Sequence, residues 1–160
     1  MKPPTPKYII SACLAGINCT YRGSNKFHPS ISKLYKKGLG IAVCPEVMGG
    51  LSTPRENSEI ADGDGYSVLL GRSKAISSSG KDLTEKYICG SLAILDLANR
   101  FGIKKAILKS KSPACGFGSI YDGTFKNNLK PGSGVLAALL SKKGLKISTE
   151  KTAGTVFKNL

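Results

Sequence analysis

Cysteine is the residue type in this sequence that can take part in the widest range of chemistry. Five cysteines are spread along 160 residues, and no two of them form a CxxC pair. Cys13, Cys44 and Cys115 each follow a short apolar segment typical of a buried strand. Thiolates favour soft metal centres such as iron–sulfur clusters, zinc or copper, and three thiolates leave one coordination position open, as in catalytic metal sites. The alternative is buried structural cysteine, since cysteine is among the most buried residue types.

The other two cysteines have weaker claims to a role. Cys89 stands beside Ile88 in an expected helix, where we predict core packing. Cys19 comes six positions after Cys13 and could be a fourth ligand or a thiol without a role, of which we favour the latter. An odd set of cysteines fits free thiols in a reducing compartment better than a disulfide framework, so we expect a cytoplasmic protein.

Two polar residues accompany the expected ligands. Glu46 is two positions after Cys44, and Ser112 is three positions before Cys115. A carboxylate near a partly dry metal site is a candidate general acid or base, because burial can tune its pKa. The alternative is a structural role, in which Glu46 caps or salt-bridges a loop and Ser112 caps the turn before Pro113.

The pattern of apolar segments predicts an α/β fold, with one three-layer, Rossmann-like domain whose mainly parallel sheet lies between helices. In such a sheet, ligands bind beyond the carboxyl ends of the strands, so the three cysteines should converge there. The strands are expected at 7–12, 39–43, 105–109 and 145–148, and the helices at 31–37, 87–101 (capped by Asp82 or Thr84) and 134–143. Residues 52–81 contain only one short apolar core, at 66–70, and we predict an excursion with a hairpin turning near Gly71-Arg72.

Composition and charge limit the function classes. Hydrophobic residues make up 41% and charged residues 21% of the chain, which argues against disordered, collagen-like and coiled-coil proteins. One domain is expected over 1–160, with a core at about 8–150 and a C-terminal arm at 151–160. No segment has the length and apolarity of a membrane span or a secretion signal.

The net charge of +14 favours anionic substrates. Nucleic acid is the less favoured partner, because aromatic residues are few and no stacking motif is present.

Four motifs around the cysteines carry a resemblance. They are SACLAG at 11–16, CPEVMGGL at 44–51 with Thr53-Pro54-Arg55, SPACG at 112–116, and IYDGTF at 120–125. Together, from about residue 8 to residue 150, they resemble the domain of unknown function 523 family, whose characterised members are thiouracil desulfidases. The resemblance implies an iron-sulfur enzyme that converts a thiolated pyrimidine, as thiouracil or a thiouridine nucleotide, to the oxo form with release of sulfide.

The resemblance also implies roles for particular residues. A 4Fe-4S cluster would be held by Cys13, Cys44 and Cys115, with the fourth iron open to the substrate sulfur. Glu46 and Ser112 would be catalytic. Apart from the resemblance, the candidate substrate-binding residues are Ser11, Arg55 and Gly116. Because the net charge of +14 favours a phosphorylated substrate, Arg55 or Lys109 is the candidate contact for its phosphate.

The sequence departs from the family pattern at two places. Thr20-Tyr21-Arg22-Gly23 stands where many members have Arg-Tyr-Asp-Gly, and Ala114 replaces a common serine. An additional domain that some relatives carry has no room here, which favours free bases or nucleotides as substrates. Two other functions remain as alternatives, a three-cysteine zinc hydrolase or deaminase and a basic RNA-binding module.

Overall fold

A four-stranded parallel sheet forms the centre of the molecule. The computed structural model describes residues 2–158. Within them, β1 (Tyr8–Ser11), β2 (Gly40–Val43), β5 (Lys105–Leu108) and β8 (Lys146–Thr149) pair in the order β2-β1-β5-β8, all parallel. The four predicted strands are therefore confirmed to within one residue at each end.

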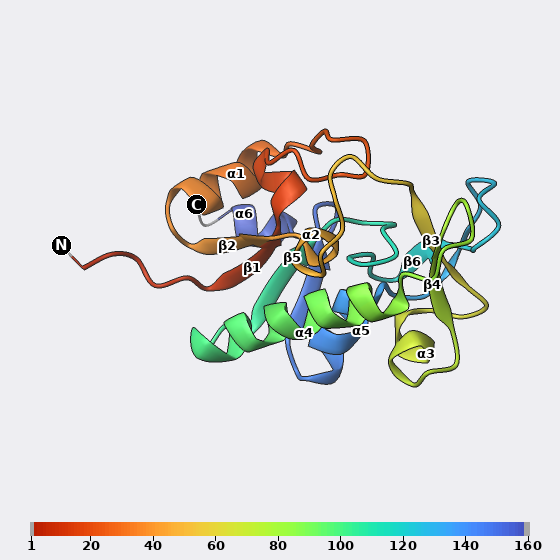
Figure 1. Ribbon diagram of the computed structural model, residues 1–160. Helices are drawn as coiled ribbons and strands as arrows, with labels where there is room; N and C mark the ends of the chain where they lie inside the picture. Colours follow the sequence, from red (N-terminus) through yellow and green to blue (C-terminus); the bar gives the residue numbers. More distant parts are fainter. Residues whose placement is uncertain (1, 159–160) are drawn as a thin grey trace.

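Helices cover both faces of this sheet (Figure 1). The 3-10 helix η1 (Ala12–Ala15), α1 (Pro29–Lys36) and α6 (Gly154–Phe157) belong to one face. The long helix α4 (Thr84–Arg100) and α5 (Val135–Lys142) cover the other. The predicted three-layer α/β architecture is confirmed.

The apolar strands are buried on both sides, which explains why they show no alternation of polar and apolar residues. Successive side chains of a strand point to opposite faces. Ile9 and Leu108 accordingly join the core under α4 and α5, whereas Ile10 and Ile107 join the core under α1. All four side chains are completely buried.

The order of the strands creates a binding crevice. From β1 the chain crosses to β2 on one side, then returns to β5 on the other side of β1 and continues outward to β8. The winding direction therefore reverses at β1. In open α/β sheets a crevice forms beyond the carboxyl ends of the strands at this reversal.

Residues 52–81 contain a hairpin, but the prediction of a turn near Gly71-Arg72 was wrong. The strands β3 (Ser58–Ala61) and β4 (Lys74–Ser77) are antiparallel, and the short helix α3 (Gly65–Leu69) lies in their connection. The side chain of Asp64 caps α3, because its Oδ1 accepts a hydrogen bond from the Tyr66 N–H at 3.0 Å. The apolar residues 66–70 therefore begin a capped helix and do not form a strand of the hairpin.

A second hairpin was not predicted. It pairs β6 (Ser119–Tyr121) with β7 (Leu129–Pro131), and Figure 1 shows β6 beside β3 and β4 at the end of the molecule away from the N-terminus. Its strands are only three residues long, too short for a clear alternating pattern. The hairpin carries the loop after the third cysteine motif back towards the sheet.

A very close approach of two helices fixes the segment after Cys44. The short helix α2 (Pro45–Met48) packs directly on α4. A Cβ added to Gly90 would lie 1.9 Å from the carbonyl oxygen of Pro45, and one added to Gly49 would lie 2.0 Å from that of Lys86. Glycine at both positions lets the two backbones touch.

Part of the expected C-terminal arm is helical. Helix α6 lies within it, and Ala153 is buried in the core under α1. Residues 159–160 lie outside the described residues. Across residues 2–158, no helix has the length and apolar character needed to cross a membrane.

Candidate active site

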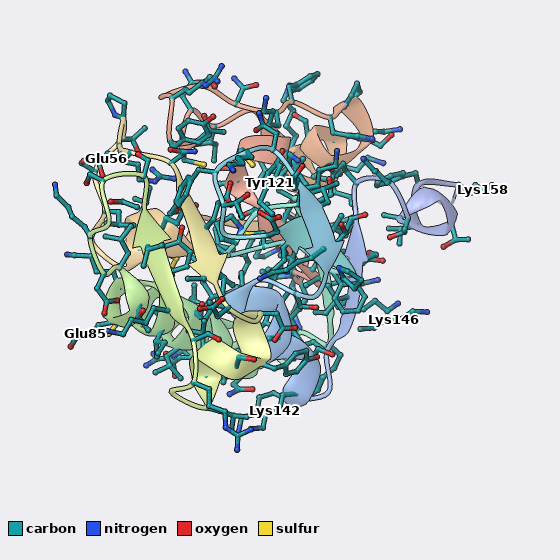
Figure 2. All side chains as sticks on the ribbon, turned by 90° about the vertical axis from the view of Figure 1, so that its right-hand side faces the viewer. Glu56, Glu85, Tyr121, Lys142, Lys146 and Lys158 are labelled. Carbon is teal, nitrogen blue, oxygen red and sulfur yellow. The ribbon has the colours of Figure 1, made fainter. Side chains whose placement is uncertain are left out.

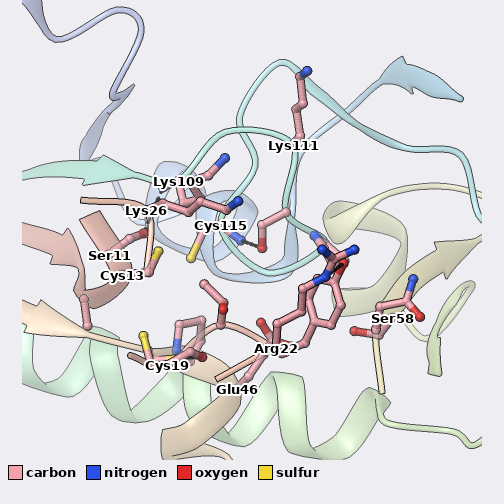
Figure 3. Close-up of a pocket in the computed structure, with 18 of the residues that line it drawn as sticks. Ser11, Cys13, Cys19, Arg22, Lys26, Glu46, Ser58, Lys109, Lys111 and Cys115 are labelled. Atoms are coloured by element: carbon pink, nitrogen blue, oxygen red, sulfur yellow. Dashed lines mark hydrogen bonds between the residues drawn. The ribbon is translucent and has the colours of Figure 1, made fainter. Parts of the chain in front are cut away.

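Thiols from four parts of the chain line one cavity of about 500 Å³ at the carboxyl ends of the central strands. Cys13 lies in η1 immediately after β1, Cys44 follows β2 directly, and Cys115 lies in the loop after β5. Figure 3 shows the sulfur atoms of Cys13 and Cys115 pointing into the same space. The structure thus brings together the three cysteines that topology predicted to converge.

Cys19 is the fourth thiol of the cavity, although a thiol without a role was the favoured prediction for it over a fourth ligand. It is 8% exposed, and its carbonyl oxygen accepts a hydrogen bond from Arg55 Nη2 at 2.8 Å. The same oxygen lies 3.8 Å from the Cys44 sulfur. Cys19 is therefore held close to a predicted ligand by a buried arginine.

Cys89 lies elsewhere, and the prediction of core packing for it was wrong. It is exposed on α4. The neighbouring helix positions Tyr87, Gly90 and Ser91 are buried instead. The helical period rotates Cys89 away from the sheet, which an apolar neighbour in sequence does not reveal.

The cavity favours protonated thiols. A hydrogen bond with the Cys13 thiol, with burial, raises the pKa of Cys19 to about 11, although a hydrogen bond with Cys44 acts in the opposite direction. A hydrogen bond with Cys19 and burial raise the pKa of Cys44 well above the usual range, and burial does the same for Cys115. A bound cation would oppose these shifts, because metals bind the deprotonated thiolate.

The loop that carries Cys115 is held at both ends. Ser112 Oγ accepts hydrogen bonds from the backbone N–H groups of Ala114 and Cys115, each at 3.1 Å. The N–H of Gly134, at the start of α5, donates to the Gly116 carbonyl at 2.7 Å. The structural alternative for Ser112, a turn cap, is therefore observed. Ser112 also lines the cavity, so its own O–H remains available as a donor.

Gly116 has a packing role in this loop. A Cβ at this position would lie 2.6 Å from the carbonyl oxygen of Ser112. Gly116 is buried and is not among the residues that line the cavity. The absence of a side chain at Gly116 therefore lets its backbone pack against the backbone of its own loop, at Ser112.

Glu46 lines the cavity and is held by two donors on one oxygen. Its Oε1 accepts hydrogen bonds from Arg55 Nε at 3.1 Å and from the Tyr87 hydroxyl at 2.9 Å. Its side chain is 15% exposed, and that of Arg55 is 7% exposed. Within residues 2–158, no hydrogen bond reaches Oε2, so this oxygen is available to a molecule in the cavity.

Arg55 forms hydrogen bonds with three segments of the chain, at Cys19, at Glu46 and at 52–53. Besides Glu46 and Cys19, its guanidinium donates to the Ser52 carbonyl and to Thr53 Oγ1, each at 3.1 Å. Burial alone would lower the pKa of Arg55, but the adjacent Glu46 carboxylate more than offsets this, and the pKa is raised. All three guanidinium nitrogens thus have protein partners, although Arg55 also lines the cavity.

Ser11 lies at the end of β1 and faces the same cavity. It is only 2% exposed. Its Oγ accepts a hydrogen bond from the Lys109 N–H at 2.9 Å, and a hydrogen bond to Cys115 opposes the rise in the pKa of that thiol. Ser11 therefore ties the ends of two central strands to one of the thiols.

In Figure 3, Lys26 and Lys109 lie across the cavity from Glu46, Arg22 lies near Glu46, and the Lys111 side chain points away from the sulfur atoms. Lys26, Lys109 and Lys111 belong to the cavity lining. Lys109 also contacts Glu150 at 3.3 Å. This arrangement makes the cavity favourable for an anion.

Much of the remaining positive charge lies elsewhere. Figure 2 shows Lys142, Lys146 and Lys158 along the outer edge of the molecule, apart from Tyr121, which lines the cavity. The net charge of the chain is therefore not a measure of the charge at the site.

Sequence reasoning missed several residues of the site. Tyr87 entered only as the first residue of the expected helix 87–101, Tyr121 entered only within the IYDGTF motif, and Ser58 and Glu59 were not singled out. The Tyr87–Glu46 pair is separated by 41 positions. No local pattern reports such a contact, and a tyrosine at a core position of a helix was the one available hint, because buried tyrosine hydroxyls need partners.

The thiols of the cavity are soft donors. Cys13, Cys44 and Cys115 all line it. Soft thiolate sulfur is the ligand that iron–sulfur clusters use, so these residues have the chemistry to hold one.

Comparisons with known proteins agree with this geometry. A family model described as 2-thiouracil desulfurase matches residues 8–152. An uncharacterised Bacillus subtilis (strain 168) protein named YbbK is 44% identical over 149 residues, which are 93% of this chain and 99% of that protein. A solved structure, described as the 4Fe-4S-dependent thiouracil desulfidase TudS, superposes with a TM-score of 0.83 at 34% identity, covering 96% of both chains.

Proposed function

The chain belongs to the 2-thiouracil desulfurase family, and from this premise we propose that it is a 4Fe-4S-dependent desulfidase acting on a thiolated pyrimidine. The reaction replaces the thiocarbonyl sulfur by the oxygen of water and releases hydrogen sulfide. The observation that carries the proposal is the meeting of three strand-end thiols, a carboxylate and a hydroxyl at one cavity. The match to TudS over nearly the whole chain supports the cofactor.

Cys13, Cys44 and Cys115 are the proposed ligands of the cluster. They follow three neighbouring strands, and three ligands leave one iron without a protein partner. When bound, the cluster supplies a soft Lewis acid that attracts the substrate sulfur and draws electron density from the adjacent carbon. Ser11 supports this site by its hydrogen bond to Cys115.

Glu46 is the proposed general base. Because Oε1 is occupied by Arg55 and Tyr87, Oε2 is the oxygen that can accept a proton from water in the cavity. The proton is then available to the departing sulfur. Such positioned proton transfer contributes about 100-fold to 10,000-fold to a rate.

Ser112 is the proposed donor that orients substrate or water. Its oxygen already accepts hydrogen bonds from two backbone N–H groups. Its hydroxyl proton can therefore be donated to a molecule in the cavity. A fixed donor of this kind reduces the reorganisation needed during the reaction. The loop restraint and the catalytic role are thus compatible.

The charge of the cavity favours a nucleotide over a free base. Among the described residues, five cationic side chains line the cavity, against two carboxylates, Glu46 and Glu59. Arg55 pairs with Glu46 and Lys109 pairs with Glu150, and the other three cations are Arg22, Lys26 and Lys111. A thiouridine monophosphate therefore should have a higher kcat/KM than thiouracil. This preference should decrease as the salt concentration rises, because salt screens exposed charges.

The test is anaerobic reconstitution with iron and sulfide, followed by assays with thiouracil and with thiouridine monophosphate. Loss of thiocarbonyl absorbance and release of sulfide measure turnover, and iron content with visible absorbance measures the cluster. Glu46→Gln should keep the cluster and lose 100-fold or more in kcat. Cys44→Ala should lose the cluster, whereas its matched control Cys89→Ala should keep it.

Several outcomes would contradict the proposal. A protein that is active without iron, or that binds zinc and keeps its activity in air, would favour the hydrolase alternative. Salt-sensitive binding of oligonucleotides with no turnover would favour the RNA-binding alternative. A fully active Glu46→Gln variant would remove the role of Glu46, and loss of the cluster in Cys19→Ala would show that four cysteines hold it.

A further inference from the structure

A buried chain of hydroxyl groups ends on the carboxylate of Glu46. The Tyr87 hydroxyl lies 2.9 Å from Glu46 Oε1. On its other side, the same hydroxyl forms a short hydrogen bond with Ser58 Oγ. Ser58 comes from β3 and Tyr87 from α4, so the chain connects two elements outside the central sheet to α2.

The donors in this chain have a definite order. A carboxylate accepts hydrogen bonds, and Glu46 Oε1 also accepts one from the Arg55 Nε–H at 3.1 Å. The Tyr87 hydroxyl must therefore donate to Glu46 Oε1. Its oxygen is then the acceptor for the hydroxyl of Ser58, which gives the direction Ser58 to Tyr87 to Glu46.

Tyr87 reaches the cavity only through its two hydrogen-bond partners, Glu46 and Ser58. Its side chain is completely buried, and it is absent from the cavity lining, which includes both Glu46 and Ser58. Burial and the neighbouring Glu46 charge raise the pKa of Tyr87, so its hydroxyl keeps its proton and acts as a fixed donor.

The packing beneath the chain allows little adjustment. Gly49 and Gly90 bring α2 and α4 into backbone contact, which sets the height of Glu46 above Tyr87. With Arg55 and Tyr87 both on Oε1, the carboxylate has two hydrogen bonds at one oxygen and, among residues 2–158, none at the other. Rotation of the carboxylate would break both hydrogen bonds at once.

We propose that Tyr87 is a positioning residue for the reaction, which holds Glu46 so that Oε2 faces the cavity, and that Ser58 supports it by orienting the Tyr87 hydroxyl. The inference rests on the proposed role of Glu46 as the general base. It goes further in assigning the orientation of that base to a buried tyrosine that never touches the substrate. Misplacement of a catalytic group by about 1 Å can cost about 100-fold in rate.

The experiment compares Tyr87→Phe, Ser58→Ala and the double variant with the unchanged, anaerobically reconstituted protein. Tyr87→Phe should lower kcat about 10-fold to 100-fold and leave KM within 2-fold. Ser58→Ala should lower kcat less, and it should have no further effect in the Tyr87→Phe background, because the link through Tyr87 is already broken. Iron content, visible absorbance and circular dichroism should be unchanged in all three.

A matched control separates this role from a general effect of losing a hydroxyl. Tyr35 is 42% exposed on α1, and Tyr35→Phe should leave kcat and KM unchanged. Tyr87→Phe with full kcat, alongside an inactive Glu46→Gln, would overturn the inference and leave the proposed function intact. The link through Ser58 would be overturned if the losses of kcat in Ser58→Ala and Tyr87→Phe multiplied in the double variant. It would also be overturned if Ser58→Ala raised KM both alone and together with Tyr87→Phe. An active Glu46→Gln would instead refute the proposed base, and this inference with it.

Discussion

Replacing Arg55 by methionine should destabilise the protein strongly, because the change leaves a buried carboxylate without its cation. The Arg55 side chain is 7% exposed and that of Glu46 is 15% exposed. Methionine preserves much of the apolar length of the side chain but makes none of the four contacts of the guanidinium. The carbonyl oxygen of Cys19 also loses the hydrogen bond from Arg55 Nη2.

The size of the effect follows from burial. Removing one partner of a buried ion pair costs about 3–5 kcal/mol, whereas an exposed pair contributes about 0.2–1 kcal/mol. Glu46 keeps the hydrogen bond from Tyr87 and some contact with water, which places the expected loss near the lower limit, about 3 kcal/mol. With a urea m-value of about 1–3 kcal/mol/M, the unfolding midpoint should fall by about 1–3 M.

The assay is urea unfolding followed by far-ultraviolet circular dichroism, on protein prepared without the cluster so that cluster loss does not contribute. The chain offers a matched control in Arg100, whose pair with Asp96 is largely exposed. Arg100→Met should cost less than about 1 kcal/mol. Adding Glu46→Gln to Arg55→Met should recover part of the loss, since no buried charge then lacks a partner.

Equal losses of stability in Arg55→Met and Arg100→Met would contradict the effect of burial. A further loss of stability when Glu46→Gln is added to Arg55→Met would show that the destabilisation comes from packing and not from an unpaired carboxylate. Arg55→Lys adds a further check. It retains the charge but not the planar fork, so its stability should lie between those of Arg55→Met and the unchanged protein.

Two more predictions concern packing and pH. Gly90→Ala should lower stability by about 1–3 kcal/mol or prevent folding, because its Cβ would lie 1.9 Å from the Pro45 carbonyl oxygen, and a normal thermal denaturation curve for this variant would contradict the close helix contact. For Glu150, burial raises the pKa, but hydrogen bonds from Ser110 and the Lys109 charge more than offset it, so the pKa is lowered. Its contribution to stability is therefore present above the unfolded pKa of about 4.3 and lost as the pH falls through the folded value. The difference in Tm between the unchanged protein and Glu150→Gln should accordingly shrink from pH 7 to pH 3, and a constant difference would contradict this assignment.

The sequence by itself determined the central sheet and its three longest covering helices, α1, α4 and α5. Apolar runs such as 7–12 and 105–109 identified buried parallel strands, because both faces of such strands are covered. Position at a strand end then predicted that Cys13, Cys44 and Cys115 would meet, since parallel strands present their carboxyl ends to one edge. The motifs around them indicated the family, which the comparisons confirmed.

Only the tertiary structure decided which atoms meet within the site. Cys19 belongs to the cavity because Arg55, 36 positions away, holds its carbonyl, and Cys89 is exposed because of the rotation of α4. Glu46 receives the Tyr87 hydroxyl because two glycines bring α2 against α4. Periodicity reports the burial of a residue and the face on which it lies. It does not report the partner of a polar side chain, because that depends on how separately formed elements pack at distances of a few ångströms.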